Sequence, residues 1–231
     1  MDPRDDFRWP PPPGFLSPRE DNSTALTASA PPGKELTAQS GSEPANQAPD
    51  ASNPAPPETA RAAMVIASNS PRNPVVSLGS TVWSTIPMPG QPARVAVKAD
   101  ADLPDLKMHA TMTLRKNTDP TLLATHTIDL KFSFADGAPI TGVKDVEPKM
   151  RNLGSTAPEA LRAVKVKISD VYFLIALAVG DQDTARNLDL LQTRAWFDFP
   201  LLLNDNRIAK LMFEKSTKGE AMLAKAFEAW K

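Results

Sequence analysis

Alternating apolar and polar residues mark the sequence after residue 74. In residues 107–115, and again in residues 123–134, every second side chain is apolar and those between are mostly polar or charged. Alternation over this length predicts β-strands with one buried and one exposed face. The loop 116–122 would join the two strands as an antiparallel hairpin.

A second hairpin is predicted near the end of the chain, from residues 194–203 and 207–215. If the short loop between them is tight, Phe197 lies opposite Phe213 and Phe199 opposite Leu211. Pro200 has no amide hydrogen, which predicts that its strand lies at a sheet edge or carries a bulge there. Further β-favouring stretches are 75–78, 81–86, 94–99, 163–169 and the wholly apolar 171–179, which we expect to be buried on both faces.

Helical patterns occupy two later segments. Residues 181–193 predict a helix whose inner stripe is Ala185, Leu188 and Leu191. The stretch after Thr217 has apolar residues at helical spacing up to Trp230, and Glu220 completes capping-box spacing with Thr217. Residues 138–162 are irregular, with a short helix expected at 156–161.

These patterns predict a mainly β fold. We expect an antiparallel β-sandwich or a strongly curved sheet with two or three helices, including a C-terminal one. The globular domain would span residues 73–231. Residues 1–72 are rich in Pro, Ala and Ser, contain 14 of the 24 prolines and show no sustained period. They predict a disordered tail, because such a segment buries too little apolar surface to offset the entropy of ordering.

Composition removes several classes of function. The formal net charge is -1 and neither part of the chain has a basic excess, which argues against nucleic acid as a partner. The chain has no cysteine, so disulfides, thiolate metal sites and a cysteine nucleophile are excluded. The longest apolar run, 171–179, is far shorter than the roughly 20 residues of a membrane span. We therefore expect a soluble chain, cytoplasmic or periplasmic.

Candidate functional residues gather around the first predicted hairpin. The loop sequence contributes Arg115, Lys116 and Asp119, which could present charges to a ligand or simply stabilise the loop. If residue 115 pairs with residue 123, His109 faces Asp129 across the sheet. We treat these five residues as a candidate interaction site and predict no metal or cofactor. No nucleotide-binding, hydrolase or metalloprotease motif is present.

The two histidines should lie on opposite faces of the hairpin. His126 belongs to the apolar face of its strand, so we expect a core histidine with a satisfied ring nitrogen. His109 belongs to the polar face. The two side chains therefore cannot share a metal ion.

Several stretches resemble an uncharacterised family of bacterial, mostly alphaproteobacterial, proteins. They are TVWST (81–85), MTLRKNTDPTLLATHTIDLKF (112–132), VYFLIAL (171–177), ARNLDLLQTRAWFDFPLL (185–202) and EKSTKGEAMLAKAFEAWK (214–231). The resemblance implies no activity and no catalytic residue. In similar proteins a membrane span often precedes this domain, which implies a place in the cell envelope.

The leading functional hypothesis is a non-catalytic binding or scaffolding domain on a flexible tether, acting through a protein partner. One alternative is a hydrolase or transferase whose carboxylates meet only in the fold. Another is a secreted effector with a disordered export segment. The oligomeric state stays open.

Overall fold

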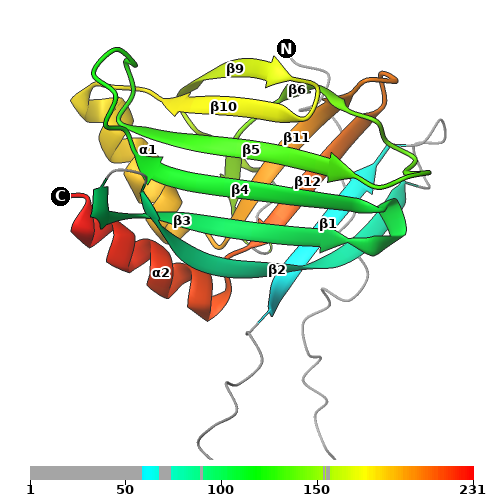
Figure 1. The fold of residues 1–231 in the computed structure, drawn as a ribbon, viewed down its shortest axis with the longest axis horizontal. Helices are drawn as coiled ribbons and strands as arrows, with labels where there is room; N and C mark the ends of the chain where they lie inside the picture. Colours follow the sequence, from blue (N-terminus) through cyan, green and yellow to red (C-terminus); the bar gives the residue numbers. More distant parts are fainter. Residues whose placement is uncertain (1–58, 68–73, 89–90, 153, 155–156) are drawn as a thin grey trace, which may run out of the picture. The chain divides into compact units, whose positions relative to one another are not determined.

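The computed structural model describes residues 59–67, 74–88, 91–152, 154 and 157–231. They form one antiparallel sheet of 12 strands, strongly curled into a half-barrel, with two α-helices at one end (Figure 1). The predicted mainly β class and the C-terminal helix are confirmed. Of the two architectures considered, the curved sheet is correct.

Most strands lie next to a strand that neighbours them in the chain, and the non-consecutive neighbours along the sheet are β7–β11, β12–β1 and β5–β10. Their bounds are β1 (Thr59–Ile66), β2 (Val75–Met88), β3 (Gln91–Leu103), β4 (Met108–Lys116), β5 (His126–Phe134), β6 (Val143–Val146), β7 (Lys149–Arg151), β8 (Glu159–Ala160), β9 (Ala163–Ser169), β10 (Tyr172–Leu177), β11 (Trp196–Leu203) and β12 (Ile208–Glu214). The helices are α1 (Asp181–Thr193) and α2 (Ser216–Ala229), and a 3-10 turn, η1 (Pro104–Leu106), precedes β4. The sheet order is β8-β7-β11-β12-β1-β2-β3-β4-β5-β10-β9, with β6 also paired to β11.

Strand β1 corrects the predicted domain boundary. It lies within the segment assigned to the tail, yet it pairs with β2 on one side and with β12 on the other. Its side chains belong to the core, where Ala62 and Met64 are at most 1% exposed. The folded domain therefore includes residue 59. The tail prediction for residues 1–58 lies outside the described residues.

The β4–β5 hairpin has the predicted faces but a different register. Met108, Met112 and Leu114 are buried on the inner face, whereas His109 is exposed on the outer one. Arg115 pairs with Thr127, not with residue 123, because the loop continues to Thr125 and β5 begins at His126. The shift changes which polar side chains meet across the outer face.

The β11–β12 hairpin has the predicted register. Phe197 lies opposite Phe213, and Phe199 opposite Leu211. Pro200, however, lies in a strand with neighbours on both sides. Its missing amide falls where β11 changes partner from β7 to β6, and its carbonyl accepts a hydrogen bond from the Glu147 amide at 2.9 Å.

Both helices contribute side chains to the single core. In α2 these are Leu223, Ala226 and Phe227, and just beyond it the buried Trp230 donates from its indole to the Val95 carbonyl at 2.8 Å. In Figure 1 both helices lie at the same end of the curled sheet.

The predicted inner stripe of α1 is partly wrong. Asn187, Leu190 and Leu191 are buried, whereas Ala185 is exposed. The Asn187 amide bonds to both the N–H and the carbonyl of Arg162 at 2.8 Å, which ties α1 to the start of β9.

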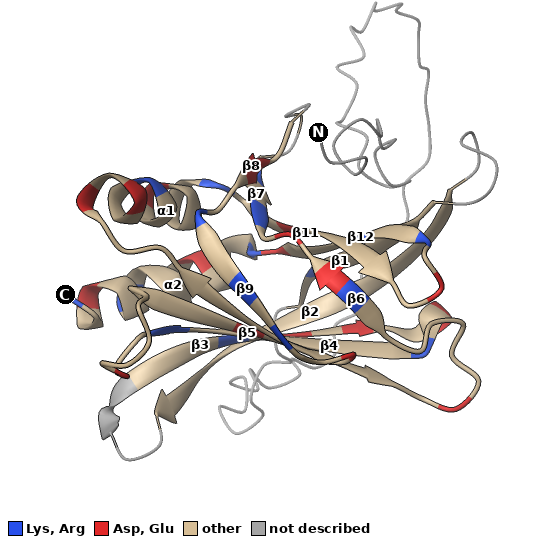
Figure 2. Ribbon diagram, turned by 90° about the horizontal axis from the view of Figure 1, so that it is seen from above, with Lys and Arg blue, Asp and Glu red and all other residues tan. Residues whose placement is uncertain are grey.

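The segment 138–162 forms the short strands β6, β7 and β8 instead of a loop with a helix. Where β6 approaches β9, the contacts are side-chain ion pairs. Lys165 on β9 binds Asp145 at 3.2 Å and also Glu147. Figure 2 shows β6 and β9 next to one another at this junction.

Candidate functional site

Arg115, Asp129 and Tyr172 meet on the outer face of the sheet, across β4, β5 and β10. The Tyr172 hydroxyl donates to one carboxylate oxygen of Asp129 at 2.5 Å. The Arg115 guanidinium lies 3.0 Å from the other oxygen and also donates to the Thr127 hydroxyl at 3.2 Å. We call Arg115, Asp129 and Tyr172 the outer polar cluster.

Burial and the neighbouring carboxylate change the acidity of Tyr172. Desolvation, reinforced by the hydrogen bond to Asp129, raises the pKa of the phenol to about 12. The ammonium of Lys131 lies 4.6 Å from the centre of the Tyr172 ring, in cation–π geometry. At neutral pH the cluster is therefore a fixed hydrogen-bonded group with a neutral phenol.

An exposed apolar stripe lies beside this cluster on strand β9, which ends the sheet. Val164 is 65% exposed, Val166 40% and Ile168 54%. Val166 is opposite Leu174, and Leu174 is opposite Asp129, so stripe and cluster share one face. A β-bulge between Tyr172 and Phe173 displaces Ile168 from the regular register.

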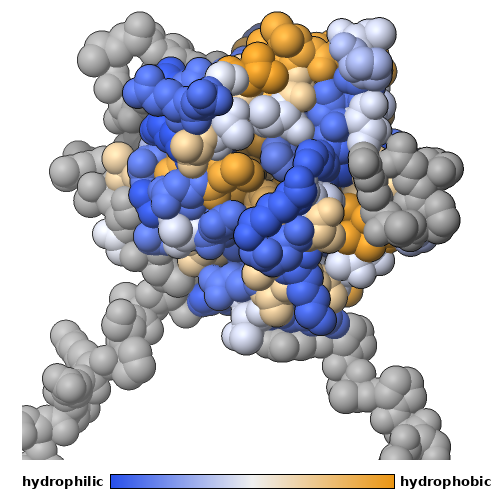
Figure 3. Space-filling model, turned by 90° about the vertical axis from the view of Figure 1, so that its left-hand side faces the viewer, coloured by the Kyte–Doolittle hydropathy of each residue, from blue (hydrophilic) through white to orange (hydrophobic). Residues whose placement is uncertain are grey.

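One end of the molecule also exposes hydrophobic surface. Figure 3 views the end where the helices lie, which is largely hydrophilic, and shows a hydrophobic area at the upper rim. In Figure 1 the upper edge of the molecule at this end is formed by the loop between β4 and β5 together with β9 and β10. Contiguous exposed apolar surface of this kind is typical of interaction sites.

Of the five residues predicted as a site, the structure brings two together. Arg115 and Asp129 form an ion pair on the outer face. The predicted His109–Asp129 contact is wrong, since Asp129 lies opposite Thr113 and His109 opposite Ser133. His109 instead lies 3.5 Å from Asp100 on β3.

Lys116 and Asp119 have separate structural environments. The Lys116 ammonium donates to the carbonyl of Trp230, which joins the end of β4 to the C-terminal residues. Asp119 accepts from the amide and the hydroxyl of Thr121, at 2.9 and 2.7 Å. The first bond links distant parts of the chain and the other two stabilise the loop, so neither residue belongs to the outer polar cluster.

Sequence reasoning did not place Tyr172 or the valine stripe in the site. The alternation of residues 163–169 was a visible signal. However, the alternation alone does not show whether the valines or the lysines of β9 face the solvent. A lysine can lie on the inner side of the sheet when it forms ion pairs there. Lys165 does so here, and its valine neighbours point outward.

His126 lies in the core, as predicted. Its ring is 5.3 Å from the ring of Trp230 and 6.1 Å from that of Phe227. Desolvation, with a smaller repulsion from Lys116, lowers its pKa to about 4. The predicted hydrogen bond is not found at Nδ1, which has no partner among the described residues.

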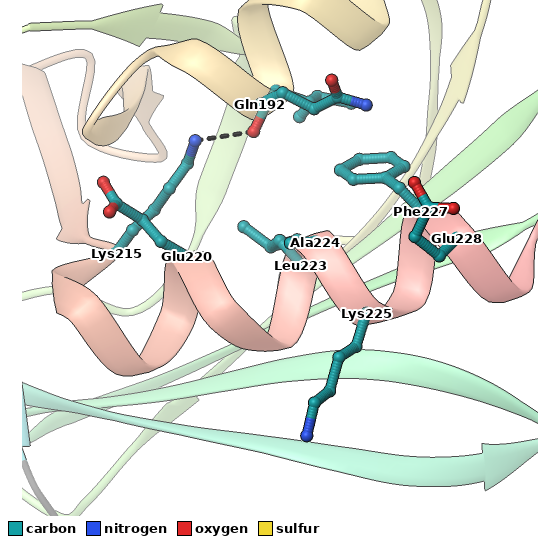
Figure 4. Close-up of a pocket in the computed structure, with 9 residues that line it drawn as sticks. Gln192, Lys215, Glu220, Leu223, Ala224, Lys225, Phe227 and Glu228 are labelled. Carbon is teal, nitrogen blue, oxygen red and sulfur yellow. Dashed lines mark hydrogen bonds between the residues drawn. The ribbon is translucent and has the colours of Figure 1, made fainter.

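A pocket of about 470 Å³ lies between α1 and α2 (Figure 4). The ammonium of Lys215 donates to the Leu191 carbonyl near the C-terminal end of α1 at 2.6 Å. Desolvation lowers the pKa of Lys215 to about 8. The carboxylates at this pocket, Glu220 and Glu228, project from exposed positions of α2.

The described residues contain no group of three His, Asp or Glu side chains placed to hold a metal ion. None of the helices in the described part of the chain is long and apolar enough to cross a membrane. Comparison with family models, curated proteins and solved structures gives no match. The resemblance to the alphaproteobacterial family therefore stays a prediction.

Proposed function

We propose that this chain is a non-catalytic binding domain that recognises a protein partner through the outer face of β9, β10, β5 and β4. The observation that supports this most directly is the exposed stripe of Val164, Val166 and Ile168 on the last strand of the sheet. Apolar side chains exposed in a row lose contact with water when a partner covers them, which favours association.

The position of β9 adds a second reason. An edge strand has backbone groups available to pair with an added strand. Lys165 and Lys167 and the bulge near Tyr172 are features that restrict indiscriminate edge pairing. Both lysines are ion-paired within the domain, with Asp145, Glu147 and Asp170, so a partner that covers the valines without displacing these ion pairs would be selected over random strands.

The partner segment is extended and has alternating apolar residues, with an acidic group beyond them. Its apolar side chains would contact Val164, Val166 and the half-buried Leu174. Its acidic group would approach Lys131, which lies over the Tyr172 ring beside the Arg115–Asp129 ion pair on the same face. Such a segment complements both the shape and the charge of the surface.

The test uses a photo-crosslinking residue placed at Val164 in the full chain, expressed in its native host. We expect crosslinking to one protein and to a single extended segment of it, mapped by mass spectrometry. With the purified partner, Val166→Asp should weaken binding about 10- to 100-fold, the effect of losing one buried apolar side chain.

Leu123→Asp is the matched control. Leu123 is 80% exposed in the loop before β5, so the same change there should leave affinity within twofold. Equal loss of binding in both variants, or crosslinks scattered over many proteins at background level, would refute the proposed surface.

A further inference from the structure

The pocket between α1 and α2 combines an apolar wall with a buried lysine at one end. Leu191 on α1 and Leu223 and Phe227 on α2 are buried in the core and also line the pocket. Its volume of about 470 Å³ lies within the range of small-molecule sites, which is roughly 300–1,000 Å³. The space is therefore large enough for a small organic ligand.

Lys215 brings a positive charge to this pocket without a counter-ion. The residue is 1% exposed, and its ammonium donates to the Leu191 carbonyl, the bond that Figure 4 marks with a dashed line. Within the described part of the chain this carbonyl is the one acceptor of the ammonium, which forms no ion pair there. An ammonium has three N–H donors, so the remaining ones are available to a ligand.

A buried ammonium without a counter-ion is unfavourable, and the acidity of Lys215 reflects this. Desolvation, the largest effect, lowers its pKa to about 8, while Glu220 opposes the shift and Arg194 adds to it. Glu220 is exposed on α2 and acts on Lys215 without forming an ion pair. A carboxylate that reached the ammonium would supply the missing negative charge.

The other charged residues at the pocket do not take this role. Glu228 forms an ion pair with Lys231 at 2.6 Å. In Figure 4 the side chain of Lys225 points away from the gap between the helices. Lys215 is therefore the charged group that the pocket presents between its apolar walls.

We propose that this pocket binds a monocarboxylate with an apolar tail, with the carboxylate on Lys215 and the tail along Leu223 and Phe227. A charge-assisted hydrogen bond is strongest where water is excluded. The tail gains free energy by leaving water for the apolar wall. A cationic ligand would be repelled by Lys215, and an uncharged one would leave its charge without a counter-ion.

Lys215 also has a structural role, because a cation near the C-terminal end of α1 interacts favourably with the helix dipole. The two roles differ in their consequences. A lysine that only caps α1 would affect stability and leave the affinity for a carboxylate unchanged. The residues of the pocket are not those of the surface proposed for a protein partner, so the two proposals are tested separately.

Isothermal titration calorimetry of the full chain with octanoate at pH 7 tests the proposal, with octan-1-ol as the uncharged comparison. We expect one octanoate per chain and at least tenfold weaker binding of octan-1-ol. Lys215→Met removes the charge but keeps a long side chain, and should weaken octanoate binding about 10- to 100-fold. Glu220→Gln removes a nearby negative charge, so it should tighten binding about two- to fivefold.

A second pair of variants leaves the buried lysine in place. Ala224 lines the pocket from an exposed position of α2, so Ala224→Phe should narrow the entrance and weaken octanoate binding at least tenfold. Ala221→Phe is the matched control, because Ala221 is exposed on the same helix but does not line the pocket. Circular dichroism checks that each variant is folded.

The pH dependence of the affinity distinguishes Lys215 from a surface lysine. Octanoate stays ionised above pH 7, whereas Lys215 loses its proton near pH 8, so the affinity should fall at least fivefold between pH 7 and pH 9.5. An ordinary lysine, with a pKa of about 10.4, would keep most of its charge over this range. Absence of octanoate binding, or equal binding to the wild type and to folded Lys215→Met, would overturn the proposal. So would equal affinities for octanoate and octan-1-ol, which would make the pocket a purely apolar site.

Discussion

The indole ring of Trp83 lies against the backbone of Gly219, where strand β2 meets helix α2. A Cβ atom at residue 219 would be 2.8 Å from two ring carbons of Trp83. The ring cannot easily move, since it is 1% exposed and its Nε1 donates to the Glu214 carbonyl at 2.8 Å. The absence of a side chain at residue 219 therefore fixes how closely α2 approaches the sheet.

We expect Gly219→Ala to destabilise the protein by about 1–3 kcal/mol, the range for overpacking a filled core. A loss of stability would point to the contact with Trp83, because Gly→Ala inside a helix ordinarily stabilises a protein by up to about 1 kcal/mol. Urea unfolding followed by circular dichroism measures the change. Thr217→Ala, an exposed site two residues earlier, should stay within about 0.5 kcal/mol. A stabilised Gly219→Ala variant would contradict the close contact.

Stability should fall between pH 7 and pH 5 because of His126. Its pKa in the folded protein is about 4, below the usual 6.5, so the unfolded chain binds a proton in this range and the folded chain does not. The unfolding free energy should drop by about 2 kcal/mol between pH 7.5 and pH 5. His126→Gln should remove most of this dependence. His109→Gln, at the exposed histidine, should retain it, and the opposite pattern would refute the assignment.

The chain contains a single tyrosine, so phenolate absorbance reports Tyr172 alone. We expect a titration midpoint of about 12 in the folded protein, against about 10 after unfolding. Folding stability should accordingly decrease as pH rises from 10 toward 12. Asp129→Asn should lower the midpoint, since it removes the negative acceptor, yet leave it above 10 because burial remains.

Asp100→Asn is the control for this titration. Asp100 lies on the same outer face but bonds to Thr111 at 2.8 Å instead of to Tyr172. Its replacement should leave the phenol midpoint unchanged. Equal midpoints in the wild type and in Asp129→Asn would mean that the Tyr172–Asp129 bond does not form in solution.

Asp198 and Lys210 should behave as a coupled pair in a double-mutant cycle. Desolvation raises the pKa of Asp198 and lowers that of Lys210, and the opposite charge of each opposes this effect on the other, with Arg151 and Lys149 also acting on Asp198. We expect Asp198→Asn and Lys210→Met each to cost about 2–4 kcal/mol, with a coupling energy of about 1–3 kcal/mol. The exposed Lys231–Glu228 pair should show a coupling below about 0.5 kcal/mol. Strict additivity at Asp198 and Lys210 would contradict the pairing.

Sequence periodicity predicted the elements that bury one face against a single core. The Phe197–Phe213 pairing followed from the short loop of the β11–β12 hairpin, and that register is correct. The β4–β5 register was wrong because the length of the ordered loop depends on Asn117, whose side chain donates to the carbonyls of Asp119, Leu122 and Ala124. Such a loop carries no periodic signal.

Two other features, strand β1 and the exposed face at Tyr172, could not be predicted from the sequence for related reasons. Strand β1 has a short, alanine-rich sequence after a proline-rich segment, and its strand conformation depends on partners from both ends of the chain. Tyr172 was assigned to a strand buried on both faces, because an apolar run does not show that one face meets polar neighbours on β5. Tertiary pairing decided both cases.

The place of β1 between β2 and β12 has a consequence for biosynthesis. On the ribosome β1 emerges before the rest of the described domain, whereas β12 ends only at Glu214, so one edge of β1 has no native partner until β12, the last of the described strands, has been made. Until then β1 can be exchanged between nascent chains, as in strand-swapped assemblies. The completion of the sheet is therefore timed by the last strand to be made.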